Sequence, residues 1–440
     1  MMSSQDETAE SFLDLLKKKD HLSDVSLRGT DGRQIPAVRV LLAARSPVFE
    51  RMLYGDFAES TDRVVNLPYT GDVVEKVVAH CMSGSLQIDL PEDCGEVGAR
   101  SLTILVSAAH FFELEAMEAA ALEKSGYLMK KSPPLACALY DEAHAGAAKH
   151  EELSSNALAF IHENPDSLCS SELGADLTED STGAFFLRSE SIVNVFDARL
   201  CANELTKFRC LLAWSKKEQE EPQSQNSRAL FDTEDLLARS KQQEGPSSGE
   251  SGASLSREEN RQVVAQQLAK HIKLWLVPPS ELASSARHSG LVSAETVFDA
   301  YEAQALHAEK EGVQFVREHV NVKGAGIRGV NGKYYPNGVC DGVPQYSKKG
   351  RINWRAEILF LGRCTSNKNG NKFWFIVAER ESGEIDGSSI CYYSVPAVEK
   401  KKNSIPSKGW STLTVGASLF QGIEPSPKVS YVAECKHPER

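Results

Sequence analysis

The pattern of apolar and polar positions changes twice between Ser23 and Ser60. Apolar and polar residues first alternate on both sides of the turn Thr30-Asp31-Gly32-Arg33, which predicts a β-hairpin. A compact apolar helix follows through Val40, Leu41 and Leu42. Ser46-Pro47 then begins a second helix, whose apolar residues recur at helical spacing: Val48, Phe49, Met52 and Leu53. The pattern predicts two strands and two helices in immediate succession.

Further elements are predicted on both sides of this stretch. Before it, residues 1–20 favour a short amphipathic helix with an apolar stripe of Phe12, Leu13, Leu15 and Leu16. After it come a β-branched run at 63–67, a helix at 73–82, and a short strand with Leu86, Ile88 and Leu90. Residues 101–124 read as two helices with apolar faces. The N-terminal third is therefore predicted to be a compact α+β domain.

The order and spacing of these residues resemble the core of a BTB/POZ domain, a protein–protein interaction module. The matching residues are Ser23-Asp24-Val25, Ile35-Pro36-Ala37, Leu42-Ala43-Ala44-Arg45-Ser46-Pro47-Val48-Phe49, Met52-Leu53 and Glu59-Ser60. The resemblance implies a BTB/POZ domain at 20–128, preceded by an N-terminal helix or tail at 1–19. It also implies a device for assembly rather than a site of chemistry.

The region 132–310 reads almost wholly helical. It resembles the BACK domain that commonly follows a BTB domain, and Leu211-Leu212-Ala213-Trp214-Ser215 matches the Trp-containing helix end of that family. Residues 216–260 interrupt the helical pattern. The part at 240–256 is rich in Ser, Gly, Gln and Glu and has a single large apolar residue, Leu255, so a disordered insertion is predicted.

From residue 320 the composition changes again. Glycine becomes frequent, and aromatic residues occur in strand-like runs such as Phe373–Val377 and Ile390–Tyr393. Turn signals separate these runs, among them Asn331-Gly332, Asn369-Gly370 and Asp386-Gly387. We expect a small antiparallel β-domain at 320–435. The whole chain is then an α+β multidomain protein with a BTB fold, a helical stalk and a β-module.

Composition narrows the possible functions. The chain has 440 residues and a net charge of −12, which argues against a nucleic-acid footprint. No apolar run approaches the length of a membrane span, and the acidic, amphipathic start does not resemble a signal peptide. None of the ten cysteines forms a Cys-x-x-Cys pair, so buried or incidental thiols are expected. These features predict an intracellular protein, cytoplasmic or nuclear.

Phe57-Ala58-Glu59 are the candidate cullin-binding residues. In cullin-3-binding BTB domains a hydrophobic residue, any residue and a glutamate follow the second core helix, and this chain has that order. The resemblance implies that the hydrophobic side chain enters a pocket on the cullin, while the carboxylate orders the loop. An exposed aromatic anchor is also the kind of residue that dominates interface energy. The alternative is that Phe57 packs against its own domain.

The candidate dimer residues are Asp24 and Arg39, together with the helix residues Phe12, Leu13 and Leu16. Related domains bring the acid and the base together at the dimer interface, where a broken pair is costly. The family usually has His where this chain has Val38, which puts the detailed correspondence in doubt. A role of either group of residues within one subunit explains the same pattern.

The remaining motifs favour no enzymatic function. Gly324-Ala325-Gly326-Ile327-Arg328-Gly329 spells the dinucleotide-binding fingerprint, but turn and strand residues follow it where a helix is required. His110, His144 and His150 lack ligand-like partners in the sequence and are expected in the core or on the surface. The aromatic residues Trp354, Phe373, Trp374 and Trp410 are expected in the core of the β-module, or in a binding groove. We therefore expect no catalytic residues, no metal and no cofactor.

The sequence thus predicts a non-catalytic adaptor. Its BTB domain would form a homodimer and recruit a cullin-3-type scaffold of a ubiquitin ligase, and its C-terminal module would hold an unknown substrate protein. Two alternatives stay open: a BTB scaffold that only self-associates, and a ligand-binding role for the C-terminal module.

Overall fold

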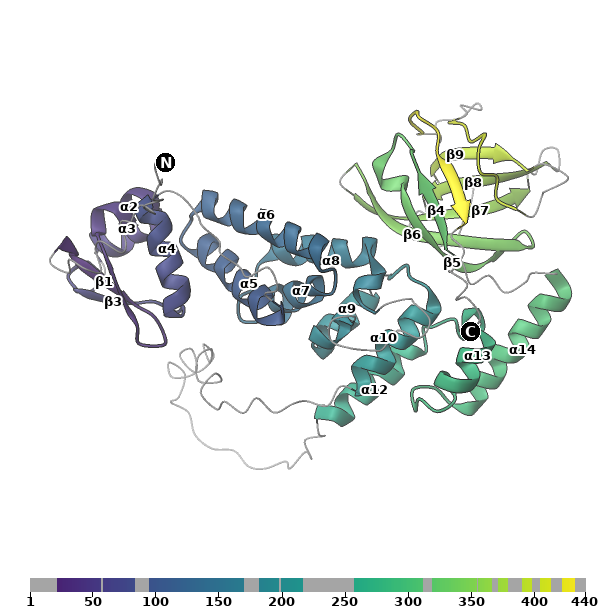
Figure 1. Ribbon diagram of the computed structural model, residues 1–440, viewed down its shortest axis with the longest axis horizontal. Coiled ribbons are helices and arrows are strands. Elements are labelled where there is room, and N and C mark those ends of the chain that lie inside the picture. The colour runs from purple at the N-terminus through teal and green to yellow at the C-terminus, as the bar shows by residue number, and fades with distance from the viewer. Residues whose placement is uncertain are drawn as a thin grey trace, which may run out of the picture. The chain divides into compact units, whose positions relative to one another are not determined.

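The computed structural model of the protein (Figure 1) describes most, but not all, of the chain. The described residues are 22–56, 58–83, 95–169, 182–197, 199–216, 257–311, 319–353, 355–365, 371–378, 390–397, 404–412 and 422–431. They form two compact units that divide between Ala157 and Leu158. The predicted N-terminal helix, the strand of Leu86 to Leu90 and nearly all of the predicted insertion lie outside the described residues.

The first unit begins with a three-stranded sheet of order β2-β1-β3, made of β1 (Val25–Arg28), β2 (Gln34–Ala37) and β3 (Val64–Asn66). The first two strands form the predicted antiparallel hairpin, with Leu27 opposite Ile35, and β3 pairs with β1 in parallel. The inward residues of the hairpin are buried, as the alternation predicts: Val25, Leu27, Ile35 and Ala37.

Three helices accompany this sheet: α2 (Arg39–Arg45), α3 (Pro47–Tyr54) and α4 (Gly71–Ser83). Ser46 is the N-cap of α3, and its hydroxyl accepts a hydrogen bond from the Phe49 N–H, while Pro47 occupies the first helical position. The prediction that this helix begins at Ser46-Pro47 is thus confirmed, and the capping hydrogen bond gives the reason.

Four more helices follow in the chain: α5 (Gly95–Phe111), α6 (Glu115–Lys131), α7 (Leu135–Ala145) and α8 (Glu151–Glu163). The chain reverses between α5 and α6 through Glu113, which has a positive φ of 53°. The buried face of α5 is the predicted apolar face: Leu102, Leu105, Ala108 and Ala109. The division between the two compact units falls within α8. The predicted domain limits at 128 and 132 stay predictions.

The helices of the second unit are α9 (Ser189–Asp197), α10 (Glu204–Lys216), α12 (Arg257–Ala269), the short α13 (Pro279–Glu281) and α14 (Ala294–Glu311). Trp214, near the end of α10, is fully buried, and its indole N–H donates to the Leu187 carbonyl at 2.8 Å. The stretch 270–308 is less regular than predicted, because Pro278 and Pro279 interrupt the helix and only short turns precede α14.

Seven strands form one antiparallel sheet in the second unit, in the order β10-β4-β5-β6-β7-β8-β9. They are β4 (Val320–Lys323), β5 (Gly332–Cys340), β6 (Val343–Ile352), β7 (Arg355–Thr365), β8 (Lys372–Ala378), β9 (Ile390–Pro396) and β10 (Lys428–Tyr431). The sheet is strongly curved, and β10, the last strand in the sequence, pairs with β4 at one of its edges (Figure 1). The chain is therefore an α+β multidomain protein, as predicted.

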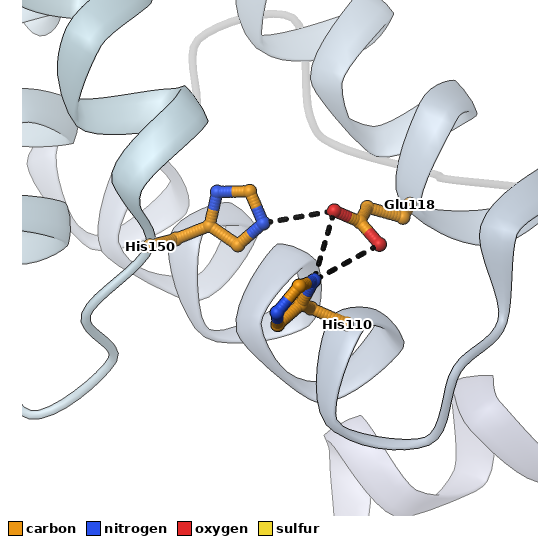
Figure 2. Close-up of side chains that lie close together, drawn as sticks. All are labelled: His110, Glu118 and His150. Carbon is orange, nitrogen blue, oxygen red and sulfur yellow. Dashed lines mark hydrogen bonds and ion pairs between the residues drawn. The ribbon is translucent and has the colours of Figure 1, made fainter.

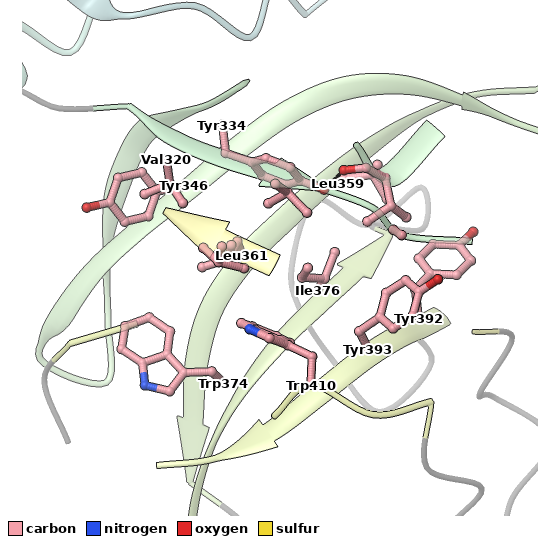
Figure 3. Close-up of a cluster of buried hydrophobic side chains, with 14 of the residues drawn as sticks. Val320, Tyr334, Tyr346, Leu359, Leu361, Trp374, Ile376, Tyr392, Tyr393 and Trp410 are labelled. Atoms are coloured by element: carbon pink, nitrogen blue, oxygen red, sulfur yellow. Dashed lines mark hydrogen bonds between the residues drawn. The ribbon is translucent and has the colours of Figure 1, made fainter. Parts of the chain in front are cut away.

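The concave side of this sheet holds an aromatic core (Figure 3). Its largest members are nearly or fully buried: Trp374, Tyr334, Tyr346, Tyr392 and Tyr393, with Trp410 at 4% exposure. The prediction that Trp374 and Trp410 belong to the core is confirmed, Phe373 is only half-buried, and Trp354 lies outside the described residues. None of the described helices is long and apolar enough to cross a membrane.

Candidate interaction site and neighbouring clusters

Arg39 ties the loop that follows α3 to the start of α2. Its guanidinium donates to main-chain carbonyls only: Ser60 at 2.9 Å, Leu53 at 3.3 Å, Glu59 at 3.4 Å, and Asp62. Five donors in a rigid fork suit Arg to this task better than the single ammonium of Lys. Arg39 therefore holds the loop at 58–62, which contains the short 3₁₀ turn Ala58–Ser60, through the main-chain carbonyls of the loop.

Asp24 and Arg39 do come together, but not through their side-chain charges. The Asp24 carboxylate accepts a hydrogen bond at 2.8 Å from the backbone N–H of Arg39, the first residue of α2. The N-cap residue Val38 has no side chain that can accept a hydrogen bond, and Asp24, directly before β1, satisfies the first free N–H of the helix instead. This contact lies within one chain. The proposed dimer role of the pair stays a prediction.

The predicted cullin-binding residues are only partly described. Phe57 lies outside the described residues, and the side chain of Ala58 is not described. Glu59 is half-buried on the loop that Arg39 holds. Beside this loop, Tyr54 at the end of α3 is 58% exposed. The predicted dimer residues Phe12, Leu13 and Leu16 lie outside the described residues.

The helix before this loop is fastened to the turn between α5 and α6. The Ser46 hydroxyl donates to the Phe112 carbonyl at 2.6 Å, and the rings of Phe49 and Phe112 stack with centroids 4.5 Å apart. At the surface Arg51 pairs with Glu113 at 2.7 Å. Hydrogen bonding, ring packing and charge therefore all fix α3 in place.

Three side chains from different helices meet near the end of α5, in a cluster that sequence analysis did not find. His110 of α5, Glu118 of α6 and His150, just before α8, direct their polar atoms toward one another (Figure 2). His150 Nε2 lies 3.0 Å from Glu118 Oε1, and His110 Nδ1 lies 3.2 Å from the same oxygen. His150 is 4% exposed, whereas His110 is 69% exposed.

Two imidazoles and a carboxylate are a donor set that could hold a transition metal. However, His150 Nδ1 accepts a hydrogen bond from the Leu153 N–H at 3.1 Å, so in the neutral ring Nε2 carries the proton and donates to Glu118. Metal ligation through Nε2 would place a proton on Nδ1, facing another N–H. The geometry therefore favours a hydrogen-bonded clamp that joins α5, α6 and the start of α8.

Each glycine of the fingerprint 324–329 has a structural role, which is conformational at Gly324 and is one of close packing at Gly326 and Gly329. Gly324 has a positive φ of 76°. A Cβ at Gly326 would lie 2.3 Å from the Glu424 carbonyl oxygen, and one at Gly329 would lie 2.2 Å from that of Arg351. A 3₁₀ turn and β5 follow, rather than a helix. These glycines therefore have structural causes of their own, which explain the motif without a dinucleotide.

The second unit contains a cavity of about 510 Å³ among α9, α10, α12 and the strands β5 to β7. Its lining is mixed, with Arg199, Lys207 and His271 beside apolar residues such as Phe196 and Phe360. The volume falls in the range of small-ligand sites.

Comparison with known protein families identifies the first part of the chain. The region compared holds the three-stranded sheet with its parallel β1–β3 pair and the helices that accompany it. Residues 13–125, about a quarter of the chain, match the family model of the BTB/POZ domain. The chain thus contains a BTB/POZ domain, a non-catalytic module for protein–protein interaction. Comparison with curated proteins finds no matching relative.

Proposed function

We propose that the protein is a BTB adaptor that dimerises, recruits a cullin-3-type scaffold, and presents a substrate protein bound to its C-terminal β-module. The observation that carries the proposal is the anchored loop at 58–62. A loop fixed by Arg39 loses little conformational entropy when a partner binds it, which favours affinity. Phe57 begins this loop in the sequence, and Glu59 is half-buried within it.

Titration calorimetry of the full chain with a purified cullin-3-type scaffold tests the proposal. Phe57→Ala is expected to weaken binding by about 2 kcal/mol or more, roughly 30-fold, as for an aromatic anchor. Arg39→Ala should weaken it as well, because it releases the loop. Glu59→Ala should weaken it because it removes a candidate contact residue while the Glu59 carbonyl that Arg39 binds stays in place. Phe298→Ala removes an aromatic side chain that is 68% exposed on α14, and serves as the matched control.

Two outcomes separate the proposal from its rivals. If the intact protein shows no binding, the ligase role is refuted and the fold is untouched. A dimer seen by light scattering without cullin binding would instead favour a scaffold that only self-associates.

A ligand-binding role for the second unit has one supporting observation, the mixed cavity with Arg199, Lys207 and His271. It predicts that a small organic anion raises the melting temperature of the full chain. Lys207→Gln should remove that rise. A screen of such anions without any shift would count against this role.

A further inference from the structure

Two cysteines of the β-module are brought together by a locked hairpin tip. Strands β5 and β6 are joined by Asp341 and Gly342, which have positive φ values of 53° and 72°. Two consecutive left-handed residues make the tight type I′ turn that suits a hairpin. Cys340 is the last residue of β5, directly before this turn.

The turn is fastened to β7 on both sides of Cys364. The Asp341 carboxylate accepts hydrogen bonds from Arg363 Nε at 2.7 Å and from Thr365 Oγ1 at 3.0 Å. Arg363 and Thr365 flank Cys364 in the sequence, and Arg363 is 3% exposed. Lys372 Nζ adds a third contact to the same carboxylate at 3.1 Å. Because the neighbours of the two cysteines are bound together across the end of β6, the two thiols are brought close enough to interact.

The interaction between the two thiols shifts their pKa values in opposite directions. A hydrogen bond from the Cys364 thiol lowers the pKa of Cys340 to about 7, against the opposing effects of burial and of the Asp341 carboxylate, and the nearby Arg363 charge adds to the lowering. The same bond, together with burial, raises the pKa of Cys364. Near neutral pH the pair therefore gives up one proton and retains the other, and a thiolate is the nucleophilic form of cysteine.

Access also distinguishes this pair. Cys340 and Cys364 are both only half-buried. By contrast, Cys391 on β9 is buried, and burial raises the pKa of its thiol to about 12. Cys81 of the BTB domain is in the same condition, buried and with a pKa raised to about 12. Reactivity follows thiolate character and exposure, so it should concentrate at the hairpin tip.

We propose that Cys340 and Cys364 form a peroxide-reactive modification site, in which Cys340 attacks the oxidant and Cys364 resolves the product into a disulfide. In the first step the Cys340 thiolate attacks one oxygen of hydrogen peroxide. The S–O bond forms as the O–O bond breaks, hydroxide leaves and takes up a proton to become water, and Cys340 becomes a sulfenic acid.

In the second step the Cys364 sulfur attacks the sulfur of the sulfenic acid. The S–S bond forms as the S–O bond breaks, and the departing hydroxide takes the Cys364 proton to leave as water. Two thiols and one peroxide thus give one disulfide and two waters: the sulfurs lose two electrons and the peroxide gains them. Forming an S–S bond of about 2.05 Å requires the hairpin tip to move toward β7.

Peptide mapping of the reduced full chain after treatment with hydrogen peroxide tests the site, with mass spectrometry under non-reducing conditions. The expected product is a Cys340–Cys364 cross-link that forms before any of the other six cysteines that the structure describes is modified. The rate should rise with pH through about 7, following the pKa of Cys340. A first modification at Cys391 or Cys81, or a rate without this pH dependence, would overturn the proposal.

Variants separate the two roles. With Cys364→Ser the disulfide cannot form, so the sulfenic acid on Cys340 should accumulate and be trapped by dimedone. Cys340→Ser should leave Cys364 untrapped at neutral pH. Cys391→Ser is the matched control and should react like the native chain. Equal trapping of Cys364 in the Cys340→Ser variant would refute the division of roles.

The turn carboxylate provides a second, independent variant. Asp341→Asn weakens the contacts that hold the hairpin tip over β7. Cross-linking should then slow several-fold, while the protein stays folded by circular dichroism. An unchanged rate of cross-linking would refute the inference that the locked turn brings the thiols together.

Discussion

Replacement of Ser46 by alanine should destabilise the BTB domain more than its small size suggests. The Ser46 hydroxyl has two partners and is fully buried: it accepts from the Phe49 N–H at 3.1 Å and donates to the Phe112 carbonyl at 2.6 Å. Ser46→Ala removes the N-cap of α3, which costs about 1 kcal/mol. It also leaves a buried carbonyl without this donor, which costs about 1–3 kcal/mol more.

The two contributions together lower the free energy of unfolding of the domain by about 2–4 kcal/mol. Hydrogen exchange followed by mass spectrometry measures this in the full chain, because it reports the opening of each segment separately. Peptides covering α3 and the end of α5 should exchange roughly 30- to 700-fold faster in the variant. Peptides from the β-module should exchange at the native rate.

Two other serines provide controls for the separate contributions. Ser293 accepts from the Thr296 N–H at 3.1 Å before α14 and is exposed, so Ser293→Ala loses a cap and an exposed hydrogen bond to the Thr296 hydroxyl, but no buried one. Ser83 is exposed at the end of α4 and donates to the Ala79 carbonyl, so its replacement should cost less than about 0.5 kcal/mol. If Ser46→Ala costs no more than Ser293→Ala, the buried bond to Phe112 contributes nothing and the reasoning is refuted.

Two further predictions concern the second unit. Burial, aided by the charge of Lys349, lowers the pKa of His162 from 6.5 to about 3, so between these pH values the unfolded chain binds a proton that the folded chain does not. The free energy of unfolding should therefore fall as the pH drops below about 6.5. Urea titrations at pH 5 and 7.5 measure this difference, which should become smaller in the His162→Phe variant. An unchanged difference would contradict the assignment of the pH dependence to His162. Gly326→Ala should cost about 1–3 kcal/mol, because its Cβ would meet two carbonyl oxygens at 2.3 and 2.4 Å. Thermal unfolding measures this cost. Gly362→Ala is the control, because a Cβ at Gly362 would have its nearest contact at 3.4 Å. Equal effects of the two substitutions would refute the packing role of Gly326.

Local signals in the sequence were enough to predict much of the fold. The hairpin and the start of α3 follow from turn chemistry, capping and periodicity, which act over a few residues. Trp374 and Trp410 could be expected in the core because large aromatic residues in a small β-domain have few other places to go. The fold class could be predicted because the periodicity that marks helices and strands is also a local signal.

The clusters of polar side chains could not be predicted, because they join residues that are distant in sequence. His110 and His150 meet Glu118 only through the packing of three helices. The contact between Asp24 and the Arg39 backbone differs from the expected charge pair because Val38 cannot cap its own helix. The thiol pair depends on the turn at Asp341, which no spacing of cysteines signals. The Asp-Gly dipeptide at 341–342 was the one available sign of that turn.

The way in which Arg39 holds the loop after α3 has a consequence for how such a surface can evolve. Its guanidinium contacts carbonyl oxygens, which every amino acid possesses, rather than the side chains of the loop. Substitutions at 58–62 can therefore alter what the loop presents without altering where the loop lies. A lineage could exchange one binding partner for another here through a few surface mutations, while a single arginine keeps the scaffold constant.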